Sequence, residues 1–217
     1  MKITLSDREG FAAFILRARA GGFGNTALFA AIEATPRRAF VPPMAVNIAY
    51  SARSIPIDCG ETLEGLDLQA KMMSYLNVDL KCRVLEIGTG SGFTAAVLGS
   101  LTARVVSIDR YHRLAEAARL RVEQLGIKNV VIRQEDATAL DANAGTFDRI
   151  ISWSAFETLP RKFLDLLSAN GVMVTPVGAS ETVQRITLLT KIGSRFDRED
   201  LGEGRFTTVQ GGLASIL

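Results

Sequence analysis

A glycine-rich segment near the middle of the chain is the strongest candidate for ligand chemistry. Residues 84–92 read VLEIGTGSG and lie between an apolar run typical of a strand and one typical of a helix. Glycine lets the backbone turn sharply and lets a ligand approach the main chain with no Cβ in the way. The free N–H groups at the start of the following helix would face the same ligand. The segment therefore predicts a binding site at the end of a strand.

The glycine spacing indicates the class of ligand. It is Gly-x-Gly-x-Gly, and Phe93 stands where the dinucleotide-binding fingerprint requires a small residue, so a pyrophosphate is disfavoured. Glu86, just before the glycines, fits a cationic sulfonium or an amino-acid ligand better. The segment resembles the first motif of the Rossmann-like methyltransferases. That resemblance implies S-adenosylmethionine as the ligand, with S-adenosylhomocysteine as the product, and contacts from Glu86, Gly88, Thr89, Gly90, Ser91 and Gly92.

Polar residues follow the next predicted strands. Asp109 ends the second strand, beside Arg110, where an acid can accept hydrogen bonds from both ribose hydroxyls. Residues 135–137 read EDA after the third strand, and in the methyltransferase class an acid here usually caps the adenine amino group, so Asp136 and Ala137 are expected to contact the base. A glycine turn can be only a tight loop, and an Asp can be only a helix cap. Their order on successive strand ends favours binding.

The fourth predicted strand ends at residues 152–155, which read SWSA. The methionine part of the ligand and the methyl acceptor would meet there, so Ser152 is expected to contact the cofactor. Trp153 would either narrow the acceptor pocket or pack beside the N-terminal helices.

The pattern after about residue 80 predicts a mostly parallel sheet. Apolar strand patterns alternate with single helices, which implies right-handed βαβ units. The tail predicts an antiparallel edge. Strands are expected at 83–87, 104–108, 130–133, 147–152, 171–175, 183–190 and 205–209, helices at 93–101, 111–125 and near 160–167, and turns at 193–194 and 202–204.

The first 80 residues are mainly helical in pattern. Helices are expected over 8–19, from Asn25 or Thr26 to Ala34, and over about 66–76, with an extended connection at 39–43 and a short strand at 54–57. We expect a single methyltransferase domain over 1–217, in which 1–80 form a helical cap and substrate loop and 81–217 form the Rossmann-like core.

Composition excludes several classes of function. The chain has 217 residues, 47% of them apolar and 22% charged, and a net charge of +2, which gives no reason to expect a nucleic-acid or membrane-surface partner. No apolar run is long enough to span a bilayer, and the N-terminus lacks the apolar core of a signal peptide, so we expect a cytoplasmic protein. One histidine, His112, and two cysteines without metal-ligand spacing provide no basis for a metal site or a histidine triad.

Over nearly its whole length the chain resembles the protein-L-isoaspartate O-methyltransferase family. The resemblance implies transfer of a methyl group to the α-carboxylate of an isoaspartyl residue in a damaged protein or peptide, and the ester then collapses to a succinimide. A carboxylate is already ionised at neutral pH, so this chemistry needs alignment more than a strong base. The matching segments are 16–19, 36–42, 49–50, 84–93, 105–109, 129–130, 176–178 and 205–206.

The substrate loop departs from the family pattern. The family usually has Gly-Gln-Thr-Ile-Ser-x-Pro, and residues 60–66 read GETLEGL, so Thr62 is kept and Glu64 replaces the serine that contacts substrate and cofactor. A Glu64 carboxylate inside the site would repel the acceptor by on the order of 4 kcal/mol at about 4 Å, which predicts weak or absent isoaspartyl activity. A solvent-facing Glu64 would have no such effect. By resemblance, the catalytic and substrate-contacting residues are Thr62 and Glu64, joined for substrate by Trp153, Ser154, Pro176 and Val177.

Two alternatives remain open from the sequence. One is a methyltransferase on the same scaffold with a different acceptor, for which Glu64 would serve as general base toward a hydroxyl or an amine. The other is a module that binds S-adenosylmethionine without catalysis.

Overall fold

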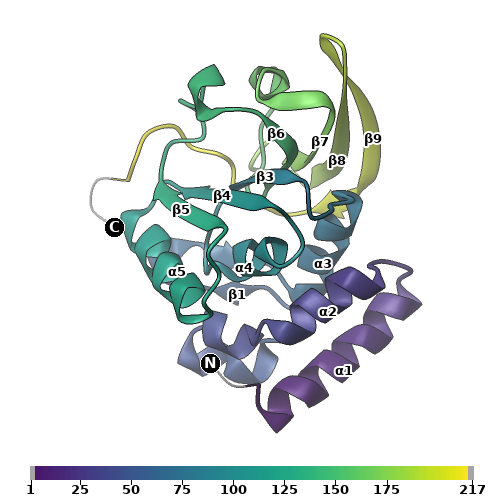
Figure 1. Cartoon of the computed structure of the whole chain (residues 1–217), viewed down its shortest axis with the longest axis vertical. Coiled ribbons are helices and arrows are strands. Elements are labelled where there is room, and N and C mark those ends of the chain that lie inside the picture. Colours follow the sequence, from purple (N-terminus) through teal and green to yellow (C-terminus); the bar gives the residue numbers. More distant parts are fainter. Residues whose placement is uncertain (1–2, 215–217) are drawn as a thin grey trace.

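A seven-stranded sheet forms the centre of the molecule in the computed structural model, which describes residues 3–214 (Figure 1). Its strand order is β5-β4-β3-β6-β7-β8-β9, with parallel pairing from β5 to β7 and antiparallel pairing of β7 with β8 and β8 with β9. The expected mostly parallel sheet with an antiparallel C-terminal edge is confirmed. The strands are β3 (Arg83–Ile87), β4 (Arg104–Asp109), β5 (Val130–Gln134), β6 (Phe147–Ser152), β7 (Leu167–Val177), β8 (Gln184–Ile192) and β9 (Arg195–Gly204).

Two helices link the first parallel strands. Helix α4 (Phe93–Gly99) follows β3 directly and is buried along its whole length, as its continuous apolar sequence requires. Helix α5 (His112–Gln124) is amphipathic and buries only its inner face. It ends before Gly126, whose φ of +71° is the left-handed conformation that commonly closes a helix.

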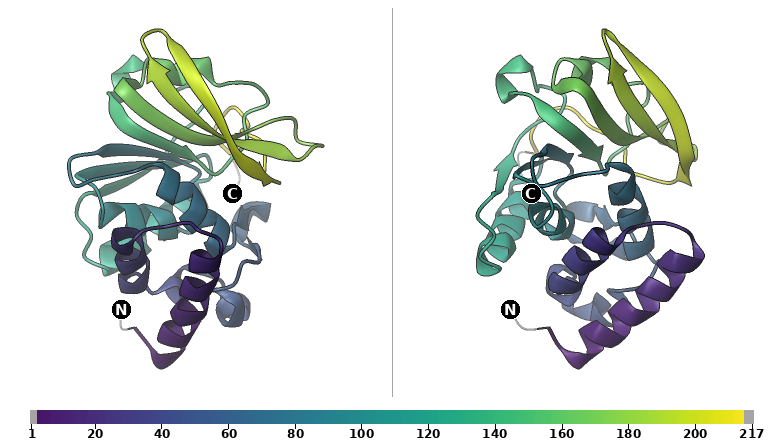
Figure 2. Two further views of the ribbon diagram at one scale, coloured as in Figure 1. Left: turned by 90° about the vertical axis from the view of Figure 1, so that its right-hand side faces the viewer. Right: turned by 45° about the vertical axis from the view of Figure 1, so that its right-hand side comes forward.

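Helices α1 (Leu5–Ala20), α2 (Thr26–Ala34) and α3 (Leu66–Tyr75) form the N-terminal part. A capping box between Thr4 and Asp7 starts α1 earlier than the apolar pattern indicates. The Asn25 side chain accepts a hydrogen bond from the Leu28 N–H at 2.9 Å, so Asn25 rather than Thr26 caps α2. Figure 2 shows α1 and α2 at the opposite end of the molecule from the β8–β9 hairpin.

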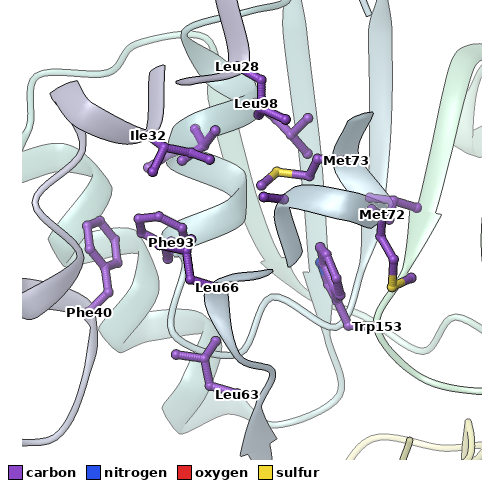
Figure 3. Close-up of a cluster of buried hydrophobic side chains, with 14 of the residues drawn as sticks. Leu28, Ile32, Phe40, Leu63, Leu66, Met72, Met73, Phe93, Leu98 and Trp153 are labelled. Atoms are coloured by element: carbon purple, nitrogen blue, oxygen red, sulfur yellow. The ribbon is translucent and has the colours of Figure 1, made fainter. Parts of the chain in front are cut away.

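A continuous buried cluster joins the N-terminal helices to the sheet (Figure 3). The Phe40 and Phe93 rings meet edge to face at 5.6 Å between centroids. Burying each such side chain contributes about 1.5–3 kcal/mol, so this contact fixes the N-terminal helices on α4. Other members of the cluster are Leu28, Ile32, Leu66, Met72, Met73, Leu98 and Trp153.

Two expected elements differ in the N-terminal and central parts. The connection expected at 39–43 is extended only at Val41 and Pro42, because two 3₁₀ helices, η1 (Arg37–Phe40) and η2 (Pro43–Ile48), flank these residues and Pro43 is tolerated at the first position of the second. The helix expected near 160–167 is only the short 3₁₀ helix η5 (Arg161–Leu164), since β7 already begins at Leu167.

The last strand is also displaced from its expected position. It is β9, and it ends at Gly204 before the expected strand at 205–209 begins. The charged sequence of β9 hides a strand pattern because it is a largely exposed edge strand. The expected turn at 202–204 lies inside β9, where Gly202 (φ +141°) accompanies a register shift against β8.

Within residues 3–214, no helix combines the length and apolar character that crossing a membrane requires.

Candidate active site

A cavity of about 830 Å³ lies at the carboxyl ends of β3, β4 and β6. This position is the one where open α/β sheets bind ligands. Six separate parts of the chain enclose it. They supply Ile57, Glu61–Glu64, Gln69, Ile87–Gly90, Thr94, Ile108–Tyr111, Leu114, Glu135, Ala137, Trp153, Ser154 and Thr207–Gln210.

The glycine-rich loop forms the cavity floor with two of its three glycines. Gly88 (φ +87°) and Gly90 (φ +50°) line the cavity in left-handed conformations, and a Cβ on Gly90 would meet only Ile57, at 3.5 Å. A Cβ on Gly92 would instead lie 2.8 Å from the Cβ of Ala118. Gly92 therefore serves the close packing of α4 on α5.

Of the two residues between these glycines, one lines the cavity and the other does not. Thr89 lines the cavity, and its hydroxyl is 2.6 Å from that of Ser107. Ser91 is buried outside the cavity, and its carbonyl accepts a hydrogen bond from Arg121 at 3.2 Å. Of the loop positions predicted to hold the cofactor, the structure brings Gly88, Thr89 and Gly90 to the cavity and leaves Ser91 and Gly92 behind it.

Asp109 lies in the cavity wall opposite this loop. One carboxylate oxygen accepts the Gly90 N–H at 2.9 Å and the other accepts the Tyr111 N–H at 3.0 Å. Burial raises the pKa of Asp109 from its ordinary value, and these two donors oppose the shift. Each oxygen keeps a further lone pair, so the side chain can still accept hydrogen bonds from a ligand.

Glu86 lies beneath the floor and does not line the cavity. Its carboxyl accepts hydrogen bonds from Thr94 at 2.5 Å, Ser107 at 2.6 Å and Trp153 at 2.9 Å. Burial raises its pKa, against these three donors. Trp153 lines the cavity while packing in the core, so both interpretations of this residue from the sequence describe its position.

At the predicted adenine side, the two residues that flank Asp136 line the cavity. Glu135 and Ala137 line the cavity, and Asp136 does not. The Asp136 carboxylate accepts the Thr138 N–H and the Gly212 N–H, both at 2.7 Å. Its role in this structure is to hold the C-terminal segment.

That C-terminal segment covers one side of the cavity and was missed from the sequence. Residues Thr207–Gln210 line the cavity, and Arg110 fixes them by donating to Gln210 Oε1 and to the Gly212 carbonyl oxygen at 3.2 Å. Ala155 adds two backbone hydrogen bonds of 2.8 Å, to Thr207 and from Val209. Arg110 and Ala155 lie far from residues 207–212 in the sequence, so no local pattern predicts these contacts. The one sequence signal near this segment is the match of residues 205–206 to the family pattern.

The β1–β2 hairpin brings the substrate loop to the inner end of the cavity. Strand β1 (Ile55–Pro56) pairs with β2 (Thr62–Leu63) around the short helix η3 (Asp58–Gly60). Thr62 and Glu64 line the cavity there, with Trp153 and Ser154 opposite them at the end of β6.

Three further predicted positions lie outside the cavity lining. Ser152 is fully buried and donates from its hydroxyl to the Ser154 carbonyl at 2.6 Å, so it shapes the strand end. Pro176 accepts the Phe156 N–H at 3.0 Å, and Val177 pairs with Phe156 in an isolated bridge. These residues support the segment after β6.

Glu64 is buried with its side chain in the cavity, and its charge differs from the one assumed from the sequence. Burial raises its pKa to about 8, against the opposing effect of the nearby Arg37 cation. The neutral acid therefore predominates at about pH 7. The predicted repulsion of a carboxylate acceptor presumed an ionised Glu64 and does not apply to the neutral form.

Arg37 is fully buried. Its guanidinium donates to the Ala49 carbonyl at 2.6 Å, to the Glu64 carbonyl at 2.8 Å and to Gln69 Oε1, and it lies 4.5 Å from the Phe93 ring centroid. Burial lowers its pKa to about 9, so it stays charged at neutral pH. Arg37 thus ties η1 to the substrate loop and to α3.

Solved structures with this fold define its class. The chain superimposes with a TM-score of 0.82 on a Plasmodium falciparum protein described as a putative protein-L-isoaspartate O-methyltransferase in complex with S-adenosyl-L-homocysteine, at 19% identity over 93% of this chain and 98% of that one. A second protein-L-isoaspartate O-methyltransferase gives a TM-score of 0.81 at 24% identity, covering 96% of this chain and 67% of that one. The fold is that of the Rossmann-like methyltransferases.

Sequence comparison then gives the family. The family model described as Protein-L-isoaspartate(D-aspartate) O-methyltransferase matches residues 12–214. A Rhizobium meliloti protein-L-isoaspartate O-methyltransferase is 45% identical over 202 residues, 93% of this chain and 99% of the relative. A relative of the same name from a Bradyrhizobium species is 42% identical over 203 residues, 94% of each chain. The chain belongs to the protein-L-isoaspartate(D-aspartate) O-methyltransferase family, as its sequence motifs predicted.

Proposed function

We propose that this protein uses S-adenosylmethionine to methylate the free α-carboxylate of isoaspartyl residues in proteins or peptides. The observation that carries the proposal is the cavity at the ends of β3, β4 and β6, which places Gly88, Gly90 and Asp109 around one ligand-sized space in a member of this family.

The residues of the cavity fit the proposed cofactor. Gly88 and Gly90 leave the floor open to close approach, and Asp109 retains acceptor capacity for a pair of hydroxyls. Ile108 and Leu114 provide apolar surface beside Asp109 that suits a purine ring, with the Glu135 acid nearby. When bound, S-adenosylmethionine would supply an electrophilic methyl group attached to a sulfonium sulfur.

The residues of this chain then need to align the acceptor and exclude water. An acceptor carboxylate is ionised at neutral pH and is already a nucleophile, so no strong base is required. The exposed Thr62 and the buried Glu64 line the cavity and would hold this carboxylate, and the buried Leu63 and Trp153 provide apolar walls. Holding the reacting groups in line within such a space lowers the entropic part of the barrier.

A methylation assay tests the proposal. The protein is incubated with methyl-labelled S-adenosylmethionine and a peptide containing isoaspartate, and base-labile label in the peptide is measured. We expect esters on this peptide and none above background on the matched peptide with a normal aspartyl residue. Absence of esters on both would contradict the proposed function.

The second candidate is a methyltransferase with a different acceptor, and the position of Glu64 in the cavity is the observation that bears on it. A general base must be ionised to accept a proton, and burial keeps Glu64 mainly neutral at about pH 7. The same assay separates this candidate, because base-stable label on extract proteins with none on the isoaspartyl peptide would favour it. Cofactor binding with no label on any acceptor would favour a non-catalytic module.

A further inference from the structure

The Gln69 side chain presents an oriented amide donor at the inner end of the cavity. Its Oε1 accepts a hydrogen bond from Arg37, and because arginine only donates, the oxygen must face the guanidinium and Nε2 must face away. Gln69 lines the cavity. Among residues 3–214 its Nε2 has no hydrogen-bond acceptor, and it is not an atom sealed from solvent. The amide therefore has a free N–H available to a ligand.

Glu64 lies at the same end of the cavity, and its own backbone N–H donates to its carboxyl. Within the described part of the chain it accepts no hydrogen bond from another residue and forms no ion pair, although it is only 9% exposed. Three charged groups influence the pKa of the Glu64 carboxyl: Arg37, Glu61 and Glu86. Arg37 is a cation, but it donates to the main-chain oxygen of Glu64 and not to the carboxyl.

This environment favours the protonated carboxyl. An ionised carboxyl in a buried place needs several donors or a paired cation. Among residues 3–214, Glu64 has its own backbone N–H as a donor, but no other residue donates to its carboxyl and no salt bridge pairs it. Two nearby acids disfavour its charge further. A protonated carboxyl has one O–H that can donate.

We propose that Glu64, as a neutral carboxylic acid, and the Gln69 amide together bind the acceptor carboxylate by donating one O–H and one N–H to it. The inference rests on the proposed function, which supplies a carboxylate as acceptor. Both are substrate-binding groups. Arg37, which touches neither the substrate nor the cofactor, acts as a positioning residue because it orients the Gln69 amide and holds the Glu64 main chain.

The pH dependence distinguishes this arrangement from a general base. A donor must keep its proton, so acceptor affinity falls as pH rises through the pKa of Glu64, which is about 8. A general base must lose its proton, so activity would rise over the same range. Binding a carboxylate against Glu64 also favours its protonated form, so part of a proton is taken up from solvent when the peptide binds near that pKa.

Calorimetry on the protein saturated with S-adenosylhomocysteine measures the affinity for the peptide and the proton uptake at each pH without turnover. The titrant is an N-acetylated, C-amidated isoaspartyl peptide with no other titrating group, used in buffers of different ionisation enthalpy. Between about pH 7 and about pH 9.5 we expect wild-type affinity to fall roughly 30-fold, with net proton uptake near pH 8. Glu64→Gln keeps a donor and cannot ionise, so its affinity stays within about threefold and proton uptake is lost.

Matched variants separate this role from a merely structural one. Glu61→Gln removes another cavity carboxyl and leaves Glu64, so it keeps the loss of affinity at high pH. Gln69→Ala weakens peptide binding about tenfold at neutral pH and leaves the pH dependence in place. Far-UV circular dichroism checks that each variant is folded.

Steady-state kinetics distinguish a donor role of Glu64 from a general-base role. We expect the KM of wild type for the isoaspartyl peptide to rise as pH passes the pKa of Glu64, and the KM of Glu64→Gln to show no such rise. An inactive, folded Glu64→Gln beside a wild type whose activity rises with pH would overturn the donor role and leave the proposed function standing. A wild type that neither binds the isoaspartyl peptide nor forms ester at any pH would overturn both.

Discussion

The indole N–H of Trp153 donates a hydrogen bond of 2.9 Å to Glu86 Oε1 beneath the floor of the cavity. The bond ties the segment after β6 to β3, the strand that leads into the glycine-rich loop. Sequence reasoning gave these two residues separate ligand contacts. In the structure they are partners that support the floor.

Trp153→Phe tests this support. The change keeps an aromatic side chain but removes one of three donors to a buried carboxyl, so we expect the free energy of unfolding to fall by about 1–3 kcal/mol. Guanidinium unfolding followed by far-UV circular dichroism measures it, because the variant removes the single tryptophan of the chain. A double-mutant cycle with Glu86→Gln should show coupling between the two positions, and strict additivity would refute it.

The buried Arg37 gives a second stability prediction. Arg37→Met leaves the Ala49 and Glu64 carbonyl oxygens without their donor, and we expect a loss of about 3–5 kcal/mol of unfolding free energy. The adjacent Arg38→Met is the matched control. Arg38 is partly exposed, and its Nε, which forms no hydrogen bond within residues 3–214, lies 3.6 Å from the buried Asp7, so we expect its replacement to cost clearly less than that of Arg37. Equal effects of the two changes in urea unfolding would show that the Arg37 hydrogen bonds are not important.

Glu64 should make stability depend on pH. Its pKa is raised from 4.5 to about 8 in the folded chain, so the folded state binds more protons between these values and stability falls as pH rises through this window. Relative to wild type, Glu64→Gln should therefore be more stable at about pH 9 than at about pH 5, by on the order of several kcal/mol.

Chemical denaturation at both pH values measures that difference. The exposed Glu157→Gln serves as control and should change stability by less than about 0.5 kcal/mol at either pH. A Glu64→Gln variant whose stability parallels wild type across the window would mean that Glu64 is solvated and ionised in solution.

The C-terminal segment over the cavity depends on Asp136. Asp136→Ala removes the acceptor for the Gly212 N–H, and we expect weaker holding of Thr207–Gln210 with about a fivefold to tenfold faster release of S-adenosylhomocysteine. Stopped-flow displacement measures the release rate. An unchanged rate would show that this segment does not retain the ligand.

Much of the fold was predictable because its signals are local. Apolar strands that alternate with the apolar α4 and the amphipathic α5 predict β3 to β6. Asn25 and Gly126 act as helix caps, as their residue types suggest. The β9 edge strand escaped prediction because an exposed strand can be almost wholly charged.

The site was less predictable, because two of its features depend on distant parts of the chain. Glycine spacing and the acid at the end of β4 place Gly88, Gly90 and Asp109 at the cavity correctly. The same spacing cannot reveal that Gly92 faces Ala118, since that contact depends on how α5 packs. The protonation of Glu64 follows from burial between η1, α3 and β3, which a sequence does not display.

Isothermal titration calorimetry of S-adenosylhomocysteine with wild type, Asp109→Ala and Asp141→Ala tests whether the cavity binds the cofactor. Asp141 caps the short helix η4 (Ala142–Ala144) outside the cavity, so its change is the control. We predict one molecule bound per chain, affinity about 10–100-fold weaker for Asp109→Ala, and little change for Asp141→Ala. No binding by wild type, or equal affinity of all three proteins, would contradict the cavity at the ends of β3, β4 and β6 as the cofactor site.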